Sequence, residues 1–113
     1  MNVIDMIRSP EDGANKETKL LFDGPGRKLT LLTLRRGTVV AEHASPDPVI
    51  IECVAGIGTL TSGGQEISLV PGRRVVLEAG EAHGIIAGDL LALLLTRCTL
   101  AARPAANSQG TSP

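Results

Sequence analysis

The sequence predicts an all-β domain built as an antiparallel sandwich or barrel. Short runs of β-type residues recur along the chain, and turn residues separate them at close intervals. No segment between these turns is long enough for an amphipathic helix. Ser62-Gly63-Gly64 is typical of a tight hairpin turn, because glycine adopts a positive φ at no steric cost. Eight or so short strands with almost no helix are typical of a sandwich or barrel.

The expected strands are rich in Leu, Val, Ile and Thr, and breakers that contain Gly, Pro or Asp separate them. They cover residues 19–22, 28–34, 38–43, 49–55, 59–61, 65–70, 73–77, 83–87 and 90–98. Leu90 to Leu95 does not alternate apolar with polar residues, so both of its faces should be covered. This run is therefore predicted to be a central strand, or one buried at a subunit contact.

The chain divides into one domain and two flanking segments. Residues 18–100 form the expected barrel domain, and 113 residues with 42% hydrophobic content suffice for one core. Residues 1–17 form an N-terminal segment whose apolar patch at 3–7 could begin a strand or a helical turn. Residues 101–113 have no apolar periodicity and are rich in Pro, Ser, Gly and Ala, which predicts a disordered tail.

Composition argues against several classes of partner. The 11 basic and 12 acidic residues nearly balance, so we expect neither nucleic acid nor a membrane as a partner. Phe22 is the one aromatic residue, which removes the usual stacking platform for flat rings and sugars. The N-terminus has no signal-peptide pattern, so a cytoplasmic location is expected. Cys53 and Cys98 form no CxxC motif and are expected to be reduced.

Two histidines are the candidate functional residues. Side chains alternate between the faces of a strand, so His43 shares a face with the apolar Val39 and Ala41. By the same rule His83 shares a face with Ile85 at the start of a later strand. Both histidines are thus expected to point inward beside a turn. They could meet near one mouth of the barrel.

Two spaced motifs carry a family resemblance. Gly72 is followed after five residues by Glu78, and then by Gly80 and His83. This run resembles the second motif of the cupin superfamily, in which Pro is usual at position 78 and Asn at position 87. The first motif of that family is matched by Gly37, His43 and Gly56, while Ser45 and Val49 stand where a second His and a Glu are usual. The resemblance implies a small antiparallel jelly-roll β-barrel.

The departures from these motifs weaken the metal site that the resemblance implies. Metal-dependent cupins typically bind Fe, Mn, Ni, Cu or Zn through three histidines and a carboxylate, and this chain keeps His43 and His83 alone. Stable protein sites usually offer three or four ligands. Cys53 shares strand parity with Val49 and Ile51 and could face the interior as a thiolate ligand. Glu81 could reach the mouth from its turn.

Three functional hypotheses follow. The first is a cupin that binds a small molecule in a barrel pocket formed by Ser45, Val49, Ile51, Cys53 and Ile85, with His43 and His83 at its polar end. The second is a metal-dependent oxygenase or isomerase, and the third is a structural or partner-binding barrel. A homodimer is expected because the low charge of 49–54 and 90–95 suits a covered sheet edge. A clean monomer at all concentrations would remove that expectation.

The remaining charged residues are expected at the surface. Arg35 and Arg36 lie at a turn, where they could flank a carboxylate-bearing ligand. Glu42 and Glu52 lie on strand faces opposite the apolar interior and are expected to be solvated.

Overall fold

The structure is a computed structural model that describes residues 1–5 and 13–99, and every regular element in these ranges is a strand. The seven strands are Lys16–Gly24 (β1), Arg27–Arg35 (β2), Val39–His43 (β3), Val49–Ser62 (β4), Gln65–Leu69 (β5), Arg74–Leu77 (β6) and His83–Arg97 (β7). All strand pairs are antiparallel, which confirms the all-β prediction. Nothing in the described ranges is a helix of the length and apolarity needed to span a membrane. The tail predicted at 101–113 lies outside the described residues.

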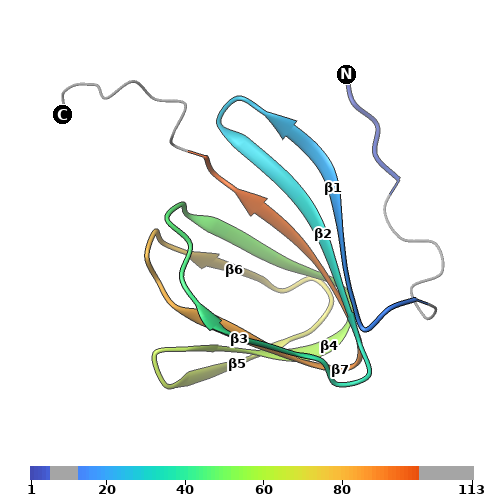
Figure 1. Cartoon of the computed structure of the whole chain (residues 1–113), viewed down its shortest axis with the longest axis vertical. Coiled ribbons are helices and arrows are strands. Elements are labelled where there is room, and N and C mark those ends of the chain that lie inside the picture. Colours follow the sequence, from blue (N-terminus) through green and yellow to red (C-terminus); the bar gives the residue numbers. More distant parts are fainter. Residues whose placement is uncertain (6–12, 100–113) are drawn as a thin grey trace.

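The seven strands form one continuous hydrogen-bonded sheet that folds into two layers, which we call the two sheets and which share β4 and β7. Residues 90–97 of β7 pair with β2, while residues 83–86 pair with β3. In the same way the first residues of β4 pair with β6 and its last residues pair with β5. One sheet therefore has the order β1-β2-β7-β4-β6 and the other β3-β7-β4-β5. Figure 1 shows the two sheets meeting at lower right and diverging toward the left, as in a jelly-roll barrel.

Two predicted turns lie inside long strands. Gly56 does not end β4 but bends it, at a point where the pairing with β7 shifts register. Its φ is 77°, and a Cβ added there would lie 2.0 Å from the carbonyl oxygen of Leu90. Gly88 and Asp89 likewise lie within β7. The prediction of eight or so short strands was wrong here, because glycine lets one strand pass from the first sheet to the second.

Leucine side chains fill the space between the sheets at one end. Leu34 of β2 is opposite Leu91 of β7, and both are fully buried. The next inward pair, Leu32 and Leu93, is buried as well. The run 90–95 therefore lies between β2 and β4, which confirms the central-strand prediction. Leu91, Ala92 and Leu93 are covered by the chain itself.

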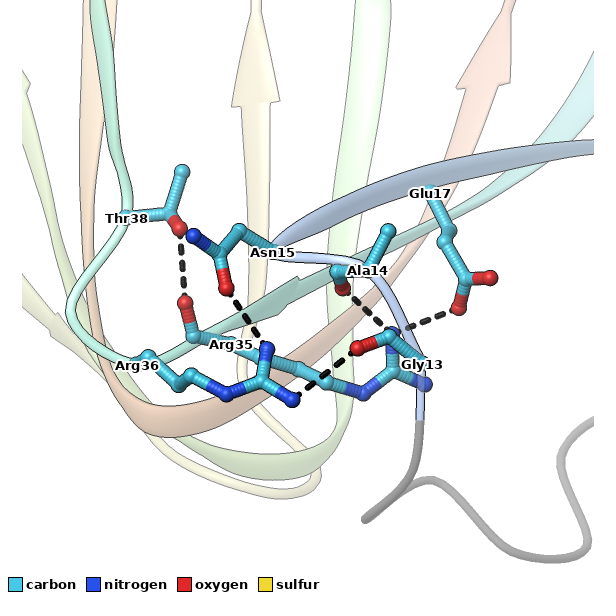
Figure 2. A network of polar contacts seen from close by, with 7 residues as sticks. All are labelled: Gly13, Ala14, Asn15, Glu17, Arg35, Arg36 and Thr38. Atoms are coloured by element: carbon cyan, nitrogen blue, oxygen red, sulfur yellow. Dashed lines mark hydrogen bonds and ion pairs between the residues drawn. The ribbon is translucent and has the colours of Figure 1, made fainter.

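Arg35 connects the start of β1 to the end of the barrel that the leucines fill, which we call the closed end. Its side chain is 5% exposed, and its Nη1 donates to the carbonyl oxygen of Ala14 at 2.7 Å and to Glu17 Oε1 at 2.5 Å. Arg36 binds Asn15 Oδ1 at 2.6 Å from the same turn (Figure 2). The expectation that Arg35 is a surface charge was wrong, because the carboxylate and carbonyl oxygens compensate its burial.

Candidate functional site: a cavity between the sheets

A cavity of about 350 Å³ opens between the two sheets. Its volume is at the lower end of the range of about 300–1,000 Å³ for small-molecule pockets. The described residues that line it are contributed by β1, β2, β3, β4, β7 and the segment after β3. They are Lys16, Thr18, Lys28, Thr30, Leu32, Val40, His43, Ser45, Val49, Ile51, His83, Ile85, Leu95 and Arg97.

The two histidines face each other across the pair formed by β3 and β7. His43 and His83 are direct partners in the strand register, and their ring centroids lie 4.6 Å apart. Opposed residues of antiparallel strands share a face, so the register itself brings the rings together. His83 is 5% exposed, whereas His43 is exposed. The rings thus combine a buried group with a solvent-accessible one.

A backbone hydrogen bond orients each imidazole. Nδ1 of His43 lies 3.1 Å from the carbonyl oxygen of Ala41, and Nδ1 of His83 lies 3.1 Å from that of Glu81. A carbonyl oxygen can only accept, so each Nδ1 carries the proton and donates it. In the neutral ring Nε2 then carries a lone pair. Neither Nε2 has a hydrogen-bond partner among the described residues, so both lone pairs can accept a proton or bind a ligand.

Four of the five residues predicted to form the pocket line this cavity. Val49, Ile51 and Ile85 contribute apolar wall. Ser45 is 8% exposed, and its Oγ accepts a hydrogen bond from the backbone N–H of Asp47 at 3.2 Å. The backbone carbonyl oxygen of Ser45 accepts a hydrogen bond from the backbone N–H of Gly80 at 2.8 Å. These bonds fix the segment between β3 and β4 against the turn that precedes His83.

Cys53 lies in the core and is not among the residues that line the cavity. It is 1% exposed, and its Sγ lies 3.6 Å from the carbonyl oxygens of Ala55 and Gly56. Burial raises the pKa of its thiol, which favours the neutral form over the thiolate that binds metals. Glu81 is exposed, and its Oε1 accepts from the backbone N–H of Glu78 at 2.9 Å. Neither side chain joins the histidine pair.

The donor set falls short of a resident metal site. The described residues contain no group of three or more His, Cys, Asp and Glu side chains placed to hold one ion. Two Nε2 atoms are available, whereas stable transition-metal sites use three or four protein ligands. Three basic side chains also line the same cavity, and they repel a dication. The residues present therefore do not fit a resident metal held by protein ligands alone.

Sequence reasoning missed the polar lining contributed by β1, β2 and the end of β7. Lys28 and Thr30 share strand parity with the buried Leu32, and this is the signal that places them on the inner face. Arg97 is the register partner of Lys28. Lys16 and Thr18 complete the set from β1.

Comparison with known proteins identifies the architecture. Neither a protein-family model nor a curated protein matches the sequence. Among solved structures, a cupin superfamily protein from Desulfitobacterium hafniense matches with a TM-score of 0.69 at 19% identity, over 74% of this chain and 76% of that one. The protein has the cupin fold.

Two further solved structures match over a similar share of this chain. KdgF from a Halomonas species gives a TM-score of 0.69 at 22% identity, over 77% of this chain and 83% of that one. Salicylate 1,2-dioxygenase from Pseudaminobacter salicylatoxidans gives a TM-score of 0.71 at 15% identity, over 74% of this chain but only 26% of that one. At these identities the likeness concerns the cupin barrel, and the chemistry of this chain must be argued from its own residues.

Proposed function

We propose that this cupin binds a small organic molecule in the cavity between its sheets. One observation carries the proposal: the cavity has an apolar wall, and two imidazoles with unpartnered Nε2 atoms stand at its edge. Apolar wall supplies binding energy, while a few placed polar groups orient a ligand. Val49, Ile51 and Ile85 supply the wall, and His43 and His83 supply the polar groups.

The histidine pair offers the ligand two hydrogen-bonding groups at one edge of the cavity. Each Nε2 accepts a hydrogen bond from a ligand hydroxyl or amide when the ring is neutral, and donates one when it is protonated. The carbonyl oxygens of Ala41 and Glu81 hold both rings in place before a ligand arrives, so less conformational entropy is lost on binding. The polar end of the pocket is thus pre-organised.

A screen by methyl NMR tests this proposal. Neutral, anionic and cationic fragments are added to protein with labelled Ile, Leu and Val methyl groups. Binding in the cavity shifts the signals of Val49, Ile51 and Ile85. Leu95→Trp fills the cavity and should abolish these shifts, whereas Val39→Trp adds the same ring to an exposed position outside the cavity and should leave them. Hits that map only to other methyl groups, or that persist in Leu95→Trp, contradict the proposal.

A metal-dependent enzyme is the second candidate. Both Nδ1 atoms donate to carbonyl oxygens, so the two Nε2 lone pairs are left for an ion whose remaining ligands would have to be water or substrate. Such hydrogen bonds are usual for histidines that bind metals. Elemental analysis of untagged protein, after incubation with Fe, Mn, Ni, Cu or Zn, measures this candidate. About one equivalent of metal that is lost in both His43→Gln and His83→Gln supports it. Metal that persists in both variants, or no metal at all, removes it.

A further inference from the structure

Three basic side chains line the cavity without an ionic partner. Lys16, Lys28 and Arg97 come from β1, β2 and β7, and none forms an ion pair with another described residue. No carboxylate is among the described residues that line the cavity. The lining therefore carries three positive charges, while the chain as a whole has a formal charge of −1.

Lys28 and Arg97 are direct partners in the register of β2 and β7. Like charges directly opposite each other in a sheet repel, so the pair lowers the stability of the empty protein. Asp23 is the register partner of Lys28 on its other side, but no ion pair joins the two residues. An anion between Lys28 and Arg97 would remove the repulsion.

The inner faces of both strands change from basic to apolar along their length. On β2 the inward residues run from Lys28 through Thr30 to Leu32. On β7 the opposing residues are Arg97 and Leu95, the partners of Lys28 and Thr30. Hydroxyl and basic groups thus lie at one end of these faces, and apolar side chains lie further in. The order matches a molecule with a charged head group and an apolar body.

We propose that the ligand of this cavity is a small organic anion whose oxyanion head group binds Lys28 and Arg97. A carboxylate or a phosphate ester supplies the shared chemistry, because a guanidinium binds either through two parallel hydrogen bonds and a lysine adds a point charge. Thr30 donates a hydroxyl proton, and Leu32 and Leu95 contact the apolar body. The inference rests on the proposed function and adds the class of ligand to it.

The cavity volume limits the size of this anion. A water molecule takes about 30 Å³ in the liquid, so 350 Å³ holds on the order of ten groups of that size. Hexanoate, hexyl phosphate, hexan-1-ol and hexylammonium are of this size and differ only in the head group. They serve as the four probes.

NMR titrations of these probes test the head group. The affinity of each probe is read from the shifts of the Leu32 and Leu95 methyl signals. Hexanoate or hexyl phosphate should bind at least tenfold more tightly than hexan-1-ol. A hydrogen bond to a charged group contributes roughly 1.5–3 kcal/mol, which is about tenfold or more in affinity. Lys28→Gln and Arg97→Gln should each weaken the anion about tenfold. Lys19→Gln removes the same charge from an exposed position of β1 outside the cavity and should change the affinity less than twofold.

The outcomes separate this inference from the proposed function. Equal binding of hexan-1-ol and hexanoate in the cavity overturns the anion and leaves a small-molecule pocket. Equal effects of Lys28→Gln and Lys19→Gln do the same. Tighter binding of hexyl phosphate than of hexanoate supports the inference and selects a phosphate ester. If none of the four probes shifts a cavity methyl while fragments of the wider panel do, the anion is overturned and the pocket stands.

Discussion

The inner faces of β2 and β7 are built from facing pairs that differ from one end to the other. At the closed end Leu34 faces Leu91, and both are fully buried. At the open end Lys28 faces Arg97, and neither is buried. The same two strands thus carry apolar pairs that stabilise the fold and a basic pair that opposes it. The fold is stabilised at one end of this strand pair, and the proposed ligand site lies at the other.

Truncation at the closed end tests this division most strongly. Leu91→Ala removes a fully buried side chain from the strand shared by both sheets, so we expect a loss of about 3–5 kcal/mol in the free energy of unfolding. Leu95→Ala lies nearer the open end, is partly exposed, and should cost about 1–2 kcal/mol. Urea unfolding followed by circular dichroism measures both. Equal losses would show that the two ends do not differ in stability.

Cys53 gives the closed half a pH dependence. Burial raises the pKa of its thiol, so the folded chain holds this proton more tightly than the unfolded chain does. Below the ordinary pKa of 9.0 both states are protonated and the effect is absent. As the pH rises above that value the unfolded chain loses its proton first, so the free energy of unfolding falls.

Urea unfolding at pH 8 and at pH 10 measures this fall. Cys53→Ala should flatten the pH dependence, whereas Cys98→Ala retains Cys53 and should keep it. The two variants differ only in which cysteine they keep, so the difference between them separates Cys53 from all the ionisable groups that both variants retain. If the free energy of unfolding falls by the same amount in both variants between pH 8 and pH 10, Cys53 is not the source of the pH dependence.

The smallest effect is expected at the open end. Lys28→Gln removes one charge from the pair with Arg97, so we expect the empty protein to gain up to about 0.5 kcal/mol. The gain should shrink as salt is added, because ions screen the repulsion. Thermal unfolding at low and high ionic strength measures it. A loss of stability at low salt would mean that Lys28 supports the empty fold.

Local pattern alone predicted much of the barrel. Short runs between turn residues indicated the strands, and Leu90 to Leu95 indicated the central one. The pattern failed at Gly56, because a glycine that bends a strand has the same local signature as one that ends it. The two cases differ in what surrounds the glycine: a Cβ added at Gly56 would lie 2.0 Å from the carbonyl oxygen of Leu90. Leu90 lies 34 positions further along the chain, so the local sequence does not reveal this contact.

The candidate site was predicted in part for the same reason. Strand parity placed His43 and His83 on inward faces, and the register brings their rings to 4.6 Å. Parity also placed Cys53 inward, but it cannot distinguish core from cavity along one face. The pairing of Lys28 with Arg97 joins residues 69 positions apart, so no local pattern reveals it. Arg35 was missed because its partners Ala14 and Glu17 come from a segment without a clear pattern.

Strand β7 begins at His83 and ends at Arg97, and its two halves belong to different sheets. A molecule that contacts both residues bridges the two sheets at their diverging ends. The edge strands β1 and β3 both line the cavity, and each is paired with a single neighbour, so they fray more readily than the central strands β4 and β7. If a ligand occupies the cavity as proposed, the opening of β1 and β3 is coupled to its release. Backbone amides of both strands should then exchange with solvent more slowly when the ligand is present.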